Sequence, residues 1–138
     1  MSDIPVRPQR LFETAGKMME AYHAALFPLC KETGIPPLAM DILLFIANHP
    51  DFSTAGDICR LRGVKPGIVS VHIERMVTAG LLGREEVAGD RRKTRLRVMP
   101  AAAPLVERGQ AVQKAFGERL LSGLDENGIA AVRAALRT

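Results

Sequence analysis

The chain has 138 residues and a formal net charge of +4, with 47% apolar and 25% charged residues. This length suits one domain with a single core, and this balance of apolar and charged residues excludes a disordered chain. Apolar runs stay well short of the roughly 18 residues that a membrane span needs, and residues 1–9 lack the apolar segment of a secretory signal. We therefore expect a cytoplasmic protein that does not bind membranes.

The basic residues are concentrated in one segment of the chain. Residues 53–99 hold ten basic and five acidic residues, a net charge of +5, whereas the remainder carries −1. Such a concentration predicts a surface that binds a polyanion, although a charged face that is merely solvated would give the same count.

In chain order, the first predicted element is an amphipathic helix from Pro8 to Cys30, with apolar residues at spacings of three and four. Pro28 removes a backbone donor and is expected to end or kink this helix near Phe27. A second helix, Pro37 to Asn48, is apolar around most of its circumference, so we expect it at the centre of the core.

Two shorter helices follow with a tight connection between them. Ser53 to Asp57 has the residues of a helix start, and the helix is expected to end at Gly63. The next helix begins near Pro66, runs to Ala79 and is closed by Gly80. The short link that contains Gly63 predicts a helix-turn-helix. In the second helix the apolar spacing predicts four core-facing side chains, those of Val69, His72, Ile73 and Met76.

A β-hairpin and two helices complete the prediction. Residues 81–87 and 94–99 are extended in character, and the turn 88–93 between them contains three consecutive bases. Leu96 and Val98 alternate with arginines, which predicts a strand with one buried and one cationic face. After Pro100 we expect a helix over 101–121 and a last helix with Asp125 as its N-cap. The predicted fold class is therefore mainly α with a small β-hairpin.

The residues for catalysis or metal binding are missing from the pattern. The three histidines lie tens of residues apart, and neither a nucleophile motif nor a phosphate-binding glycine loop occurs. We expect no enzyme activity, no metal and no cofactor. Cys30 and Cys59 have no metal-ligand or disulfide spacing, so they are interpreted as buried free thiols, with a thiol redox switch as an alternative.

Duplex DNA is the predicted partner. A helix-turn-helix places the start of its second helix in the major groove, which here offers Lys65, Pro66, Gly67, Ser70 and Val71. Ser70 can hydrogen bond to a base edge, whereas Val71 offers a methyl contact to thymine. Because residues 53–99 contain no aromatic residue for base stacking, RNA and single-stranded DNA are weaker candidates.

Further cations are placed to contact the DNA backbone and the minor groove. Phosphate contacts are expected from Arg75, Arg84, Arg95 and Arg97. The hairpin tip suits a narrow minor groove, where negative potential concentrates around an inserted arginine, and it carries Arg91, Arg92 and Lys93.

The segment Leu61 to Pro100 resembles the winged helix-turn-helix of the MarR family of bacterial transcription regulators, and the flanking helices extend the likeness over most of the chain. The likeness rests on Val69-Ser70, on the Gly80-Leu81-Leu82 exit into the hairpin, and on Asp90 followed two residues later by Arg92.

The resemblance implies a homodimeric regulator, most often a repressor, that binds a pseudo-palindromic site. It assigns 1–34 and 101–138 to the dimer interface and 35–100 to DNA binding, with a recognition helix near 66–79 and a wing at 88–93. It places Arg92 in the minor groove and makes Asp90 its buttress, through an ion pair to an arginine such as Arg75 or Arg84. Broad apolar stripes on the first and last helices also favour a dimer.

The resemblance also suggests a small aromatic or anionic effector. Arg10, Tyr22 and His23 are candidate ligand-binding residues, although their helical spacing equally fits interface packing. His72 stands where the family often has Leu, and is interpreted either as a core histidine or as a base or phosphate contact. The alternative function is a winged-helix protein-interaction module without specific DNA readout.

Overall fold

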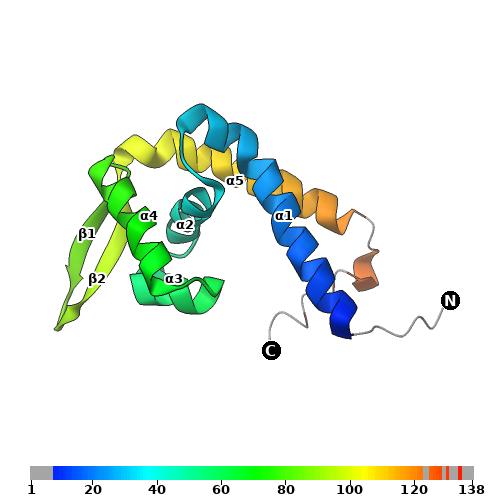
Figure 1. Cartoon of the computed structure of the whole chain (residues 1–138), viewed down its shortest axis with the longest axis horizontal. Helices are drawn as coiled ribbons and strands as arrows, with labels where there is room; N and C mark the ends of the chain where they lie inside the picture. The colour runs from blue at the N-terminus through cyan, green and yellow to red at the C-terminus, as the bar shows by residue number, and fades with distance from the viewer. Residues whose placement is uncertain (1–7, 123–124, 129, 131–133, 135–138) are drawn as a thin grey trace.

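The computed structural model describes residues 8–122, 125–128, 130 and 134, without the side chains of Pro8, Arg10, Leu11, Arg91 and Arg92. The described part is mainly helical with one two-stranded antiparallel hairpin, as Figure 1 shows. The helices are α1 (Pro8–Thr33), α2 (Pro37–Asn48), α3 (Ala55–Arg62), α4 (Pro66–Thr78) and α5 (Ala103–Leu121), and the strands are β1 (Leu82–Val87) and β2 (Asp90–Val98). The predicted fold class is confirmed.

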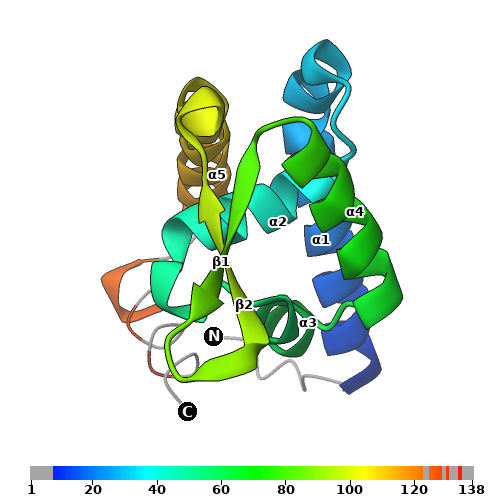
Figure 2. The same cartoon turned by 90° about the vertical axis from the view of Figure 1, so that its left-hand side faces the viewer.

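The molecule has two ends of different character. Helices α1 and α5 pack against each other, and the N-terminal half of α1 extends away from the hairpin (Figure 1). Figure 2 shows the hairpin in front, with α2 behind it and α3 and α4 beside it. Helix α2 contacts α1, α4, α5 and β2, so it joins the two ends.

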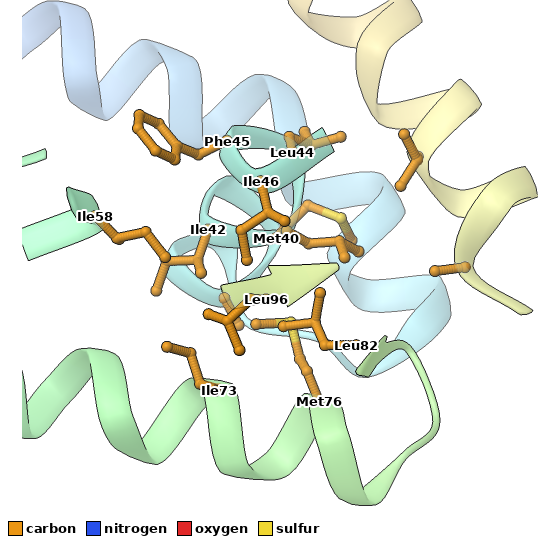
Figure 3. Packing of buried hydrophobic residues seen from close by; sticks show 14 of the residues in the cluster. Met40, Ile42, Leu44, Phe45, Ile46, Ile58, Ile73, Met76, Leu82 and Leu96 are labelled. Atoms are coloured by element: carbon orange, nitrogen blue, oxygen red, sulfur yellow. The ribbon is translucent and has the colours of Figure 1, made fainter. Parts of the chain in front are cut away.

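Helix α2 forms the centre of the core, as predicted. Every residue from Ala39 to Ile46 is buried. Side chains of α2 meet apolar side chains of α3, α4 and both strands (Figure 3), and the labelled partners are Ile58, Ile73, Met76, Leu82 and Leu96. Because this core receives side chains from α2, α3, α4 and the hairpin, it fixes the relative position of these elements.

Of the end or kink expected near Phe27, the helix end is wrong. Helix α1 continues through Pro28 to Thr33. The turn after Pro28 buries Leu29 and Cys30 in the core, and this packing offsets the hydrogen bond that proline cannot donate. The helix ends instead at Gly34, which has φ 76° and whose N–H donates to the Cys30 carbonyl at 2.8 Å.

The predicted six-residue hairpin turn was also wrong. The turn contains only Ala88 and Gly89, and β2 already begins at Asp90. Gly89 has φ 83°, a left-handed conformation that lets the chain reverse within two residues. The basic residues 91–93 therefore lie along a strand, not in a loop.

The connection into α5 differs slightly from the prediction. A 3-10 turn, η2 (Pro100–Ala102), precedes α5, which starts at Ala103 instead of Ala101. Asp125 caps the following turn as predicted, because its Oδ1 accepts a hydrogen bond from the Gly128 N–H at 2.8 Å. The predicted core positions Ile129, Val132 and Leu136 of the last helix lie outside the described residues.

Candidate nucleic-acid interface

Local capping fixes the helix-turn-helix. The Thr54 hydroxyl accepts a hydrogen bond from the Asp57 N–H at 3.1 Å and the Asp57 carboxylate accepts one from the Thr54 N–H at 3.3 Å, which is a complete capping box at the start of α3. At its end Gly63, with φ 65°, donates its N–H to the Cys59 carbonyl at 2.9 Å. Only Gly63, Val64 and Lys65 separate α3 from α4. The sharp turn therefore follows from the sequence itself.

The buried face of α4 holds it against α2 and the hairpin. Val69, Ile73 and Met76 are buried as predicted. The opposite face of its first two turns is open to solvent, because each of the predicted major-groove residues has an exposed side chain or, at Gly67, an exposed position: Lys65, Pro66, Gly67, Ser70 and Val71. The structure thus brings these five residues together on one surface.

The hairpin of β1 and β2, called the wing from here on, presents cations beside this surface. Lys93, Arg95 and Arg97 on β2 are exposed, and Arg75 on α4 is exposed as well. The middle of strand β2 is anchored to the segment before α3. Arg95 and Thr54 form an isolated antiparallel β-bridge, and the Leu96 N–H donates to the Ser53 carbonyl at 2.9 Å. The side chains of Arg91 and Arg92 lie outside what the structure describes, so their predicted contacts remain predictions.

Arg84 has a partner that the sequence did not single out. Its Nη2 donates to Glu74 Oε2 at 2.7 Å, which ties β1 to α4 across the solvent-exposed face. Both side chains are more than 40% exposed, at 44% and 63%, so the pair contributes little to stability. The predicted role of Asp90 as buttress of the wing arginine stays a prediction.

A buried polar network lies behind the helix-turn-helix, and the sequence did not predict it. The Tyr22 hydroxyl of α1 donates to Asp41 Oδ1 of α2 at 2.9 Å and accepts from Gln113 Nε2 of α5 at 2.7 Å. Arg62 Nη2 at the end of α3 lies 3.3 Å from the same Asp41 oxygen, and its guanidinium stacks over Phe45. Burial is the main cause that raises the pKa of Tyr22, so its hydroxyl stays protonated and donates to the carboxylate of Asp41.

Two of the three candidate effector residues, Tyr22 and His23, are engaged in packing. Tyr22 is buried in the network and its ring contacts those of His23 and Phe116. The nearest groove, between α1 and α5, is lined by other residues, namely Ala21, Ala24, Ala25, Phe116, Arg119 and Leu120. The side chain of Arg10 is not described. A ligand role for Arg10, Tyr22 and His23 therefore stays a prediction.

The cysteines show different environments. Cys30 is 3% exposed, and burial raises the pKa of its thiol, which opposes the thiolate that oxidation requires. Cys59 is half-buried on α3. Among the described residues, no cluster of His, Cys, Asp or Glu is suited to hold a metal ion.

Comparisons with known proteins show which solved structures this fold is similar to. Residues 33–93 match the family model for the MarR family. The solved transcriptional regulator PA3341 shares 24% identity with this chain at a TM-score of 0.78, over 91% of this chain and 92% of that one. A MarR transcriptional regulator from Methanosarcina mazei Go1 shares 16% identity at a TM-score of 0.75, over 94% and 92%. MepR from S. aureus, solved as a DNA complex, shares 18% identity at 0.74, over 99% and 95%. The chain has the winged-helix fold of these regulators.

The MarR-family match covers the surface described above. It runs from the end of α1 through α2, α3 and α4 into the wing, and the structural likeness adds α1 and α5. The structures from Methanosarcina mazei Go1 and of PA3341 are those of transcriptional regulators. No curated protein sequence matches the chain significantly. Within the described residues, none of the helices has both the length and the apolarity to cross a membrane.

His72 adopts neither of its two predicted roles in full. It is half-buried and lines a cavity of about 270 Å³ between α4 and the turn that joins α1 to α2. Its Nδ1 atom is buried without a hydrogen-bond partner among the described residues. Position 72 thus faces a cavity instead of solvent or the close-packed core.

Replacing His72 with Leu is expected to flatten the pH dependence of stability below neutral pH. Burial, and secondarily the Arg75 cation, lower the pKa of folded His72 below its ordinary value of 6.5. The unfolded chain therefore takes up a proton first, so stability falls as the pH drops from about 6.5 towards the folded pKa. Urea unfolding at about pH 8 and about pH 5 measures this. An equal loss of stability in parent and His72→Leu would contradict the assignment.

Proposed function

We propose that the chain is a homodimeric, sequence-specific regulator of transcription that binds duplex DNA and acts as a repressor in the cytoplasm, without enzyme activity. The observation that carries this proposal is the joint exposure of the first two turns of α4 and of the cations of the wing, at the same end of the molecule (Figure 1). Helix α4 has the position of a recognition helix and the wing extends beyond it, which suits simultaneous contact with two grooves.

The distribution of ion pairs supports DNA binding at this surface. Arg60 and Arg62 pair with the carboxylates of Asp57 and Asp41, so they satisfy groups of the protein itself. By contrast, Lys65, Arg75, Lys93, Arg95 and Arg97 form no ion pair with another described residue. Cations that remain exposed and unpaired on one surface favour binding to phosphates.

Two solved structures similar to this chain also support DNA binding. MepR of S. aureus and a MarR variant from E. coli were crystallised with DNA, the second with operator DNA. Both cover at least 95% of their own length in the comparison with this chain, so the likeness includes the helices outside the winged domain. We transfer DNA binding to this chain as a proposal, with residues 35–100 as the DNA-binding region.

The proposed dimer interface lies on α1 and α5. Apolar side chains are exposed there that the described residues do not cover: Phe12, Met18, Met19 and Leu120. Together with the alanine-lined groove between the two helices they favour a second copy of the chain as occupant. Two copies would present two recognition helices to a pseudo-palindromic site.

Replacing Arg92 with Ala is expected to weaken binding to sites with A·T-rich flanks by about tenfold, and to weaken other sites less. A charge-assisted hydrogen bond to DNA contributes about 1.5–3 kcal/mol, and narrow A·T-rich minor grooves concentrate negative potential. Duplex titration across a salt series measures both affinity and the slope of log K against log salt, which is about −0.9 per neutralised phosphate.

The matched control is Arg108→Ala. This variant removes the same charge from α5, where Arg108 pairs with Glu32, and it should leave the preference for A·T-rich flanks unchanged. Binding without salt dependence, or no binding to any duplex, would overturn the proposed function. Equal affinities of parent and Arg92→Ala at all sites would overturn only the role of Arg92.

A further inference from the structure

The outward face of the proposed recognition helix is unusually apolar. Ile68 is 44% exposed and Val71 is 51% exposed, although both are aliphatic. They are three residues apart, so they lie next to each other on the same face of α4. The described residues leave both side chains partly uncovered, and a DNA major groove is the partner that the proposed function places there.

The residues that normally distinguish guanine and adenine are missing from this face. Guanine is read by Arg or Lys, and adenine by Asn or Gln, through paired hydrogen bonds. From Pro66 to Thr78, α4 contains neither Lys, Asn nor Gln, and its one arginine is Arg75, in the third turn. Arg75 lines the cavity beside His72, on the side of α4 towards the α1–α2 turn. Within the first two turns, the Ser70 hydroxyl is therefore the one side-chain donor that can reach guanine or adenine, and the ammonium group of Lys65 lies ahead of them, at the N-cap.

The remaining polar side chains of α4 are also committed elsewhere. Glu74 accepts the hydrogen bond from Arg84 at 2.7 Å, which competes with the amino group of cytosine for its carboxylate. His72 has its Nδ1 atom buried at the cavity. What the first two turns present to a base pair is thus two aliphatic side chains and one hydroxyl.

The first turn also permits a close approach to DNA. Gly67 has no side chain, and a Cβ atom built on it would meet nothing within 4 Å, so the fold itself does not demand glycine there. Pro66 beside it is short and rigid. A helix start of this kind brings short side chains such as those of Ile68 and Val71 within reach of the base edges.

We propose that Val71 and Ile68 read the C5 methyl groups of thymines, so that the first two turns of α4 specify each half-site mainly through thymine methyls. This inference rests on the proposed function and names the chemical group recognised at its DNA site. The methyl group is the one apolar feature that a base presents in the major groove, and it marks the position of a T·A pair uniquely. Ser70, between the two residues, adds a hydrogen bond to a base edge.

The test begins with duplexes enriched by the purified full-length protein from a random-sequence pool. In the enriched site, each thymine is replaced singly by deoxyuridine, which removes only the methyl group and keeps every hydrogen-bonding group. We expect about a fourfold loss of affinity at one or two thymines per half-site, the effect of exposing one buried methyl, and no loss at other thymines. Replacing such a T·A pair by 5-methylcytosine·G should bind more tightly than replacing it by C·G.

The variant Val71→Ala assigns the methyl to its reader. Val71 is half-exposed, so truncation should leave the fold intact, which the thermal unfolding midpoint verifies. Val71→Ala should bind the thymine site several-fold more weakly and should no longer distinguish thymine from uracil at its position. The control Thr78→Ala, on the last turn of α4, should keep the full distinction.

The outcomes separate the two proposals. If no duplex is bound, the proposed function fails and the inference fails with it. If duplexes are bound in a salt-dependent manner but uracil replaces thymine at every half-site position without loss, DNA binding stands and methyl readout is overturned. Methyl readout by Val71 is equally overturned if Val71→Ala still distinguishes uracil from thymine.

Discussion

Truncating Leu44 to Ala is expected to lower the free energy of unfolding by about 3 kcal/mol. Leu44 is fully buried in α2, where it packs against α5. Removing its side chain loses the transfer free energy of the buried methyl and methylene groups and leaves a cavity that a helix packed on several sides cannot close. Since a domain of this size has a net stability of only about 5–15 kcal/mol, the loss is large. Urea unfolding at a fixed protomer concentration measures it.

The neighbour of Leu44 on α5 sharpens this prediction. A Cβ atom built on Gly109 would lie 2.6 Å from Leu44 Cδ2 and 2.9 Å from Cδ1, too close for either atom. Gly109→Ala should therefore destabilise the parent by about 1 kcal/mol, because overpacking exceeds the gain in helix propensity. In the Leu44→Ala background the same change should stabilise by about 1 kcal/mol, because the space is free and only the propensity gain remains.

Two control variants isolate these causes. Leu61→Ala makes the same substitution at a side chain that is 48% exposed and should cost less than about 0.5 kcal/mol. Gly117→Ala lies on the same helix as Gly109 with no atom within 4 Å of its added Cβ, so it should stabilise equally in both backgrounds. Additive effects of Leu44→Ala and Gly109→Ala would show that the two positions are not packed together.

Sequence predicted the helix-turn-helix well because its boundaries are set locally. The capping box of Thr54 and Asp57, the left-handed Gly63 and the left-handed Gly80 are each recognisable from a few adjacent residues. The buried positions Val69, Ile73 and Met76 follow from helical spacing alone. The residues of the candidate DNA surface could therefore be named before the fold was known.

Features set by distant residues could not be predicted in this way. Pro28 signals a helix end locally, but burial of Leu29 and Cys30 against α2 keeps α1 helical. The buried Asp41 lies in a helix whose other residues from Pro37 to Ala47 are all apolar, and its partners come from 19 and 21 residues away along the chain. Nothing in a helical pattern indicates which tyrosine or arginine will reach such a carboxylate.

In the candidate site, too, the features set by adjacent residues could be predicted and those set by distant residues could not. Exposure of Ser70 and Val71 follows from the periodicity of α4, and exposure of Arg95 and Arg97 follows from the alternation of residues in β2. The pairing of Arg84 with Glu74 depends on how the wing crosses α4, which the sequence does not specify. That pairing changes the chemistry of the surface, because it occupies the one carboxylate of α4 and leaves the helix with apolar readers.

Replacing Leu120 with Asp is expected to convert the proposed dimer to a 15.0 kDa monomer and to lower its affinity for a two-half-site duplex by at least about 100-fold. Leu120 is 48% exposed at the groove between α1 and α5, where a second copy is proposed to pack. A carboxylate there would lose its hydration on association without a matched partner. Phe12→Asp on α1, at a side chain 79% exposed, should act in the same direction.

The size of the effect follows from linkage of the two half-sites. In a dimer, binding of one winged domain raises the effective concentration of the second at its half-site, and a monomer loses this gain entirely. Affinity for an isolated half-site should therefore stay unchanged in Leu120→Asp. Leu61→Asp makes the same substitution at an equally exposed leucine of α3 and should remain dimeric, as light scattering would show. A dimeric Leu120→Asp, or a monomeric parent with full affinity, would contradict an interface on α1 and α5.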